Sequence, residues 1–225
     1  MLFIIYFFLF LFPTNQIDES KTLIIYFSRA GENYDVGKVD KGNTELIVDY
    51  LTKATKIKSY RIKPETEYPE SYDDTLKIAE NEQKSNDRPK IKEKLENIND
   101  YDTILLGYPI WHTHLPNIVM TQLESLNFNG KTIYPFNTHQ GSGTGNSIND
   151  IKNCVPNAIV NDGFPLKGSY ARTKDSKLDI NKWLSETLKV TYSDVEYDID
   201  SQEKGYIQKF NIYFFFILLF IFILN

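Results

Sequence analysis

The feature that most constrains the fold is the run YDTILLGYPI at residues 101–110, which carries no charge after its second position. A strand with one face in water alternates apolar and polar residues, whereas a strand covered on both faces is apolar throughout. We therefore predict a fully buried central strand at 101–110. The run TLIIYF at 22–27 has the same character and predicts a second strand of this kind.

Segments with the wider spacing of amphipathic helices alternate with these strands. Residues 43–55 place Ile47 and Leu51 on one helical face behind Asn43, a residue that can cap a helix. Further strands are predicted at 56–64, 131–138 and 157–166, and further helices at 71–86, 90–98, 117–126, 147–155 and 177–188. The alternation predicts an α/β sandwich of three layers, with a five-stranded parallel sheet between helices. Ligands of such folds bind at the carboxyl ends of the strands, so the loops after the first, third and fourth strands are the candidate site.

Composition narrows the class of protein. The chain has 225 residues and a formal net charge of −5, which fits one domain with appendages and argues against a nucleic-acid partner, since no basic stripe is present. Cys154 is the only cysteine, which excludes a disulfide framework and a thiolate metal site within the chain. We assign Cys154 no chemistry.

Both ends of the chain are apolar. The first twelve residues resemble the apolar core of a secretory signal, although a basic start and a cleavage site are missing. The final apolar run is shorter than the ~20 residues that span a bilayer and suits a membrane anchor or a GPI-like signal. We predict a signal-like segment at 1–19, the folded domain at 20–190, a polar linker at 191–209 and an apolar tail at 210–225.

These segments predict a membrane-associated protein that enters the secretory pathway, and a cytoplasmic one if the segments are not used. The absence of an N-x-Ser/Thr sequon disfavours a eukaryotic secretory lumen. An AT-rich coding sequence is an alternative origin of the apolar ends.

The first candidate loop, residues 28–45, combines Ser28, several glycines and the helix start at Asn43 and Thr44. Hydroxyls and the unpaired N–H groups of a helix N-terminus make an anion site. Neither Gly-Lys-Ser/Thr nor G-x-G-x-x-G is present, so a monophosphate is a simpler ligand than a nucleoside triphosphate or a dinucleotide. A solvated loop with a capping asparagine is the alternative.

The second candidate loop, residues 108–116, holds Trp111 between Pro109 and Pro116. A large flat side chain held rigidly at the end of a strand suits stacking on a planar ring system, although capping of the core explains it equally well. The histidines His112, His114 and His139 raise the alternative of zinc. Alternate residues of a loop point apart and no H-E-x-x-H helix is present, so we predict no metal.

The third candidate loop follows the strand at 131–138 with the sequence THQGSGTG. Ser142 lies in Gly-Ser-Gly rather than in G-x-S-x-G, and no histidine follows it in the chain, which disfavours a nucleophile elbow. Three glycines in this loop allow a ligand to approach the main chain closely.

Six motifs occur in register: YFSRAGENY, GNTE, YPESYDDTLKIAENE, RPKI, YDTILLGYPIW and FNTHQGSGTG. In this order and spacing the chain resembles, over residues 22 to about 188, the flavodoxin-like family of FMN-binding proteins, in particular its branch with a long first loop. The resemblance implies a sheet of strand order 2-1-3-4-5 with FMN at its rim.

Carried over by position, the resemblance implies the residues that bind FMN. The phosphate site would comprise Ser28, Gly42, Asn43 and Thr44 with Arg29 nearby, the isoalloxazine would be bordered by Pro109, Ile110, Trp111 and His112, and its other side by Thr138, His139, Gly141, Ser142 and Gly143. Similar proteins have a second aromatic residue and a glycine after the tryptophan. Here His112 and Thr113 follow the tryptophan, and His114 comes next. The two histidines would bias an anionic acceptor or would simply face solvent.

The resemblance implies redox chemistry in which FMN reacts and no side chain serves as an obligatory acid or base. We predict an oxidoreductase that passes electrons from NAD(P)H to a small acceptor such as a quinone. The alternative is a one-electron carrier that docks redox partner proteins and has no substrate of its own. A third alternative, a membrane-tethered binding module that has lost FMN, is disfavoured by the intact glycines and by Asn43 and Thr44.

Overall fold

A computed structural model of the protein describes residues 18–188. Three predicted segments lie outside the described residues: the signal-like segment apart from residues 18 and 19, the polar linker, and the apolar tail. Within 18–188, no helix is both long and apolar enough to cross a membrane.

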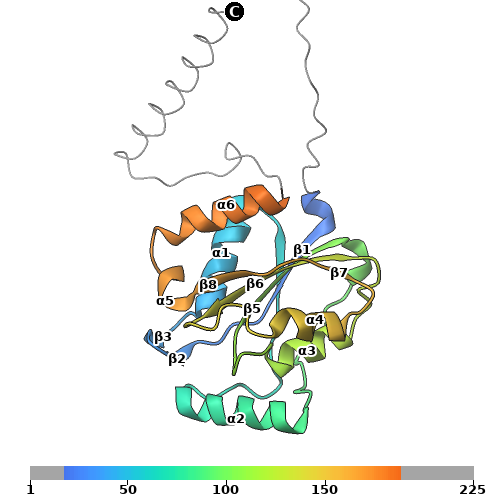
Figure 1. Ribbon diagram of the computed structural model, residues 1–225. Helices are drawn as coiled ribbons and strands as arrows, with labels where there is room; N and C mark the ends of the chain where they lie inside the picture. Colours follow the sequence, from blue (N-terminus) through green and yellow to red (C-terminus); the bar gives the residue numbers. More distant parts are fainter. Residues whose placement is uncertain (1–17, 189–225) are drawn as a thin grey trace, which may run out of the picture. The chain divides into compact units, whose positions relative to one another are not determined.

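The core of the domain is a parallel sheet with the strand order β4-β1-β5-β6-β7 (Figure 1). Its strands are β1 (Thr22–Tyr26), β4 (Lys58–Arg61), β5 (Thr103–Pro109), β6 (Thr132–His139), β7 (Ile159–Val160) and β8 (Phe164–Lys167), the last of which also pairs with β6. Counted along the chain without the small hairpin described below, this is the predicted order 2-1-3-4-5. The predicted fold class is therefore confirmed.

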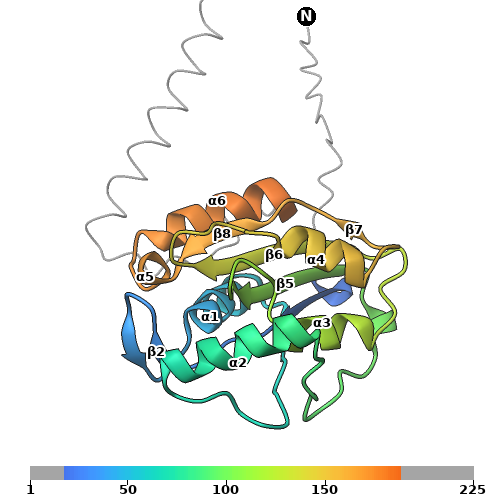
Figure 2. The ribbon, with the colours of Figure 1, turned by 60° about the horizontal axis from the view of Figure 1, so that its bottom comes forward.

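Helices cover both faces of the sheet, as Figures 1 and 2 show. The helices are α1 (Asn43–Thr55), α2 (Tyr72–Ser85), α3 (Asn117–Glu124), α4 (Ser147–Cys154), α5 (Gly168–Ala171) and α6 (Ser176–Leu188). Leu105 of the central strand faces α1 and α6, whereas its neighbours Ile104 and Leu106 face α3 and α4. All three side chains are fully buried, because the sheet has an apolar core on each face.

The predicted strand at 157–166 is wrong in one respect, because it is two short strands. β7 pairs with the start of β6 and β8 with its end, and the chain between them leaves the sheet. Gly163 lies in this break, where an added Cβ would be 2.9 Å from Cδ1 of Ile148 on α4. The break brings β8 and then α5 to the carboxyl edge of the sheet.

The predicted helix at 90–98 is wrong. Ile91 instead forms an antiparallel bridge with Pro64, and only Ile98–Asp100 makes a single 3-10 turn. The N–H of Glu65 donates to the carbonyl of Lys90 at 2.8 Å, and the N–H of Lys92 donates to that of Lys63 at 2.8 Å. Pairing with the segment after β4 thus overrides the local helical pattern.

The long first loop contains a hairpin that the sequence analysis did not predict. Its strands are β2 (Gly31–Asn33) and β3 (Gly37–Val39), and Asp35 has a left-handed φ of 57° in the turn between them. The strand β2 contacts the start of α2, as Figure 2 shows. This contact places the hairpin at the carboxyl edge of the sheet.

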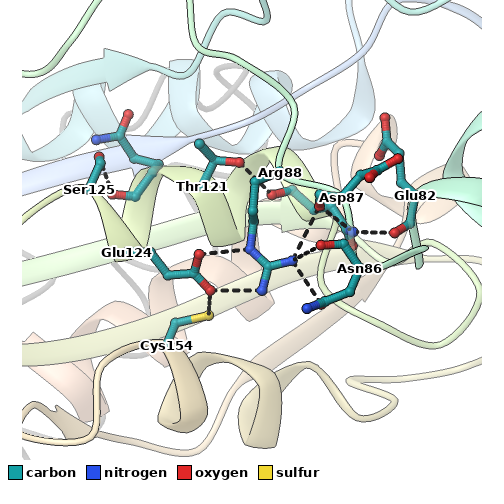
Figure 3. Close-up of polar contacts among 10 residues, drawn as sticks. Glu82, Asn86, Asp87, Arg88, Thr121, Glu124, Ser125 and Cys154 are labelled. Atoms are coloured by element: carbon teal, nitrogen blue, oxygen red, sulfur yellow. Dashed lines mark hydrogen bonds and ion pairs between the residues drawn. The ribbon is translucent and has the colours of Figure 1, made fainter. Parts of the chain in front are cut away.

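Arg88 in the loop after α2, Glu124 at the end of α3 and Cys154 at the end of α4 contact one another (Figure 3). Nε and Nη2 of Arg88 donate to the two carboxylate oxygens of Glu124 at 2.7 and 2.8 Å, and Sγ of Cys154 lies 3.7 Å from Oε1. Burial, followed by the charge of Glu124, raises the pKa of the Cys154 thiol to about 12. A protonated thiol is a poor nucleophile, so we assign Cys154 no reactive role. The Arg88–Glu124 pair joins the loop after α2 to α3.

Candidate functional site

A cavity of about 310 Å³ opens at the carboxyl ends of β1, β5 and β6. Every predicted site residue except Gly42 and Gly143 lines it. The further lining residues, which the sequence analysis missed, are Asn33, Tyr34, Tyr72, Thr75, Leu76, Ala79, Gln140 and Gly168. The structure thus brings the three candidate loops together around one cavity.

One end of the cavity is the start of α1. The Ser28 hydroxyl accepts a hydrogen bond from the N–H of Glu45 at 3.1 Å, and the buried hydroxyls of Thr44 and Thr138 are 2.8 Å apart. The amides of Asn43 and Thr44 open the helix, where N–H groups have no intrahelical acceptor. This end therefore gathers hydroxyls and N–H donors at the positive end of a helix dipole.

Gly42 makes this arrangement possible although it does not line the cavity. A Cβ at Gly42 would lie 2.3 Å from the Ser28 hydroxyl oxygen and 2.4 Å from the carbonyl oxygen of Arg29. Only a residue without a side chain lets the first loop lie this close to the helix start.

The helix α5 contacts Asn43 at this end of the cavity. Nη1 of Arg172 donates to Oδ1 of Asn43 at 2.8 Å, and a Cβ at Gly168 would lie 2.5 Å from the Asn43 amide nitrogen. The position of Asn43 thus depends on the short helix that follows β8.

The guanidinium of Arg29 is bonded to main-chain oxygens. Nη1 donates to the carbonyls of Pro69 and Glu70 at 2.8 and 3.1 Å, and Nη2 donates to the carbonyl of Glu32. Burial lowers the pKa of Arg29. Arg29 borders the cavity as predicted, but its hydrogen bonds fasten the hairpin to the segment before α2.

Trp111 forms a wall of the cavity next to the core. Its ring packs edge-on against Phe27 and Tyr68, with centroid distances of 5.4 and 4.9 Å. It also lines the cavity, so the packing against the core is observed, and stacking on a planar ring stays a prediction.

The turn after Trp111 has an unusual backbone. His112 and Thr113 have φ of 46° and 67°, and main-chain hydrogen bonds of 3.1 and 2.8 Å join Trp111 and His114. Two successive left-handed residues define a tight turn that usually contains glycine or asparagine. The Thr113 carbonyl accepts from the N–H of Asn146 at 2.7 Å, which attaches the turn to the loop before α4.

The histidines of this turn have separate partners. Nε2 of His112 lies 3.0 Å from the carbonyl oxygen of Leu76, and Nδ1 of His114 lies 3.0 Å from the Asp150 carboxylate. Across the described part of the chain, no three or more His, Cys, Asp or Glu residues are grouped as metal ligands would be.

The other end of the cavity is the loop at residues 140–146, here called the glycine loop. Nδ1 of His139 accepts from the N–H groups of Gly141 and Gly143 at 2.9 and 3.2 Å, and the Asn137 amide donates to the carbonyl of Gly143 at 2.9 Å. Burial, followed by the charge of Lys167, lowers the pKa of His139. The first residues of the glycine loop are thus held by the end of β6.

The outer wall comes from α2 and the hairpin. Tyr72, Leu76 and Ala79 lie at helical spacing on the face of α2 that lines the cavity. Tyr34 of the hairpin pairs with Tyr72 at a centroid distance of 5.8 Å and is 62% exposed. The helical period of α2 was the available signal for this wall, but the face that meets the cavity depends on packing between distant segments.

A doubly wound parallel sheet, with anion donors at the first helix and an aromatic wall at the next loop, defines a mononucleotide-binding α/β protein. Residues 21–187 match the sequence model of the flavodoxin family, and the chain belongs to this family. The predicted resemblance is confirmed. A search of curated proteins found no significant match.

Solved structures of flavoproteins are similar to the chain over most of its length. A protein from Bacteroides eggerthii assigned as a flavoprotein is 31% identical, with a TM-score of 0.60, and the match covers 76% of this chain and 99% of that one. One from Bacteroides uniformis is 27% identical, with a TM-score of 0.59 and coverage of 74% and 98%. A flavoprotein from Lactobacillus acidophilus, solved in complex with FMN, is 23% identical, with a TM-score of 0.54 and coverage of 73% and 98%.

Proposed function

We propose that the cavity binds FMN and that the protein is a redox flavoprotein that passes electrons from NAD(P)H to a small acceptor such as a quinone. The proposal of FMN rests on the cluster of hydroxyl and N–H donors at the start of α1. Among the described residues, no carboxylate lines the cavity beside this cluster. Membership of the flavodoxin family and the FMN complex of the Lactobacillus protein support it.

The residues present fit the parts of FMN. The amides of Asn43 and Thr44 would hold the phosphate, and the Ser28 hydroxyl, which accepts from Glu45, has its own hydrogen to donate. Trp111 and the glycine loop would border the ring. Bound FMN supplies reversible hydride and electron transfer, while the protein supplies position and electrostatics. We assign no side chain as acid or base.

The cofactor is tested with the purified full chain by absorption spectroscopy and equilibrium dialysis. FMN should bind with a shifted flavin spectrum, and riboflavin, which lacks the phosphate, should bind much more weakly. The double variant Ser28→Ala with Thr44→Val should weaken FMN but leave riboflavin nearly unchanged. Thr52→Val, whose hydroxyl bonds to Val48 and Asp49 on the same helix, is the control. If FMN and riboflavin bind equally well, the phosphate site is elsewhere.

A one-electron carrier is the second candidate function, because acidic side chains lie at the rim of the cavity. Asp35 and Asp73 are exposed on the hairpin and the first turn of α2, beside the Tyr34 and Tyr72 pair, whereas the neighbouring Asp74 is paired with Lys77 at 3.5 Å. An acidic rim suits docking of a basic partner protein.

Stopped-flow mixing of the FMN-loaded chain with NADH and with NADPH separates the two candidates. The oxidoreductase should be reduced directly and then reoxidised by a quinone such as menadione. The carrier should be reduced only after a flavodoxin reductase is added.

Membrane attachment through the terminal segments is a separate proposal that depends on the sequence alone. Cell fractionation of the full chain with an internal tag, compared with the chain lacking residues 209–225, tests it. A soluble full chain would contradict attachment.

A further inference from the structure

Two main-chain donors converge on one nitrogen at the end of β6. Nδ1 of His139 accepts from the N–H of Gly141 at 2.9 Å and from the N–H of Gly143 at 3.2 Å. A ring nitrogen that accepts carries no hydrogen, so the imidazole is neutral with its hydrogen on Nε2. The hydrogen-bond partners therefore determine the tautomer of His139.

These two bonds hold a part of the chain whose backbone has positive φ, which glycine adopts without strain. Gly141 and Gly143 have φ of 138° and 60°, and a Cβ at either position would meet no atom within 4 Å. A side chain at either glycine would thus meet open space, so no neighbouring segment closes on this side of the glycine loop. Hydrogen bonds from β6 hold this part of the loop, through His139 and through Asn137, which donates to the carbonyl of Gly143.

Protonation of His139 is incompatible with this arrangement. A hydrogen on Nδ1 would point at two N–H groups, and both amides would lose their acceptor. The field around the ring also opposes a positive charge. Lys167 of β8 lies opposite His139 in the sheet, whereas Pro109 and Ile110 at the end of β5 and residues 141–146 carry no charge. Asp35 of the hairpin is the nearby carboxylate, and it accepts from the Gln140 amide.

We propose that His139 is a positioning residue, whose neutral imidazole holds the glycine loop in the form that accepts the flavin ring, and whose protonation releases this loop and weakens FMN binding in acid. The second part rests on the proposed function. The first part concerns the protein without FMN and is tested separately.

The first test is nuclear magnetic resonance of the FMN-free full chain with labelled histidine. The neutral ring of His139 should carry its hydrogen on Nε2, and its pKa should lie below the ordinary histidine value of about 6.5. The amide signals of Gly141 and Gly143 should shift with the same midpoint. A neutral ring with its hydrogen on Nδ1, or glycine amides that do not respond, would overturn the positioning role.

The second test is the pH dependence of the FMN dissociation constant in the wild type and in His139→Asn. Asparagine keeps an acceptor oxygen near the place of Nδ1 but gains no proton. Below the pKa measured for His139, the ratio of the wild-type constant to that of the variant should rise toward tenfold per pH unit, the limit for one linked proton. The phosphate of FMN titrates in both proteins and cancels in the ratio.

Two further variants support this comparison. His139→Gln replaces His139→Asn if the latter does not fold. Lys167→Gln removes the opposing charge and should move the break in the wild-type profile to higher pH. Parallel profiles for the wild type and the acceptor variants would overturn the link to FMN. If no variant binds FMN at any pH, the proposed function and this link fail together, whereas the magnetic resonance result still decides the role of His139 in the loop.

Discussion

The two ends of the cavity are held in different ways. At the start of α1, Thr44 bonds to Thr138 and Asn43 bonds to Arg172, so residues about a hundred positions apart fix each other. In the glycine loop, Gly141 and Gly143 are held by His139 and Asn137, a few residues away. Contacts between distant segments break only when the domain opens, whereas local contacts can open alone. The ends of the glycine loop are also bonded to distant residues, Gln140 to Ser169 and Asn146 to Thr113. The cavity thus combines a rigid anion end with a ring end that is adjustable in the middle of the glycine loop, at Gly141 to Gly143.

The sharpest test of this difference is Gly42→Ala. The new Cβ would meet the Ser28 hydroxyl and the Arg29 carbonyl, and relief requires a shift of α1 against the first loop. We expect a loss of about 1–3 kcal/mol in the free energy of unfolding. An equal loss in binding corresponds to about fivefold to 150-fold in the FMN dissociation constant. Urea unfolding and equilibrium dialysis measure the two.

Gly168→Ala is the comparison variant for Gly42→Ala. Its Cβ meets the side chain of Asn43, which can rotate, rather than backbone. We expect a smaller loss of stability, and a larger one would contradict a rigid backbone at the start of α1.

A double-mutant cycle on Thr44 and Thr138 tests the long-range contact itself. Thr44→Val leaves the buried Thr138 hydroxyl without its partner, which should cost about 1–2 kcal/mol of unfolding free energy. Thr44→Val with Thr138→Val replaces both partners by groups of the same shape and should recover most of this loss. Additive losses in urea unfolding would show that the two hydroxyls do not act as a pair.

Gly143→Ala tests the adjustable end. The Cβ has space, but φ of 60° is left-handed, so the cost should be about 1 kcal/mol. Hydrogen exchange should report the change within residues 140–146 and not at α1. Gly143→Asn, which tolerates this φ, is the control and should cost less. Faster exchange at α1 would contradict the separation of the two ends.

The smallest expected effect is the pH dependence of stability due to His139. Its pKa is lowered in the folded protein, so its stabilising hydrogen bonds are fully present above the ordinary histidine pKa and are lost as the pH falls through the lowered value. Unfolding of the wild type and of His139→Asn should therefore differ in slope below neutral pH, by less than about 1 kcal/mol in all. Identical slopes would contradict the lowered pKa.

The sequence predicted those parts of the fold that depend on local patterns. The helix at 43–55 and the central strand were found because apolar spacing and burial agree there. The helix at 90–98 was wrong because Ile91 pairs with Pro64, a contact that local spacing does not encode. The break between β7 and β8 was missed for the same kind of reason, since only pairing with β6 separates the two strands.

The residues of the candidate site also fall into those that could be predicted from the sequence and those that could not. Residues in the loops directly after β1, β5 and β6 could be placed because parallel strands bring their carboxyl ends together. Tyr34 and Tyr72 could not, because their meeting depends on the hairpin and on the packing of α2 against it. The family resemblance placed Arg29 near the phosphate, and only the structure revealed that its guanidinium donates hydrogen bonds to main-chain carbonyls.

The position of Trp111 has an optical consequence. The chain has two tryptophans, and the other, Trp183, stacks on Phe164 at 5.1 Å in the core on the opposite face of the sheet. A ring that enters the cavity would lie near Trp111, which lines the cavity, whereas Trp183 does not line it. In a Trp183→Phe variant, the fluorescence that remains on selective excitation of tryptophan, at a wavelength that the fifteen tyrosines do not absorb, comes from Trp111 alone. Binding of a ring in the cavity should then be measurable as quenching of the Trp111 fluorescence, without any added label.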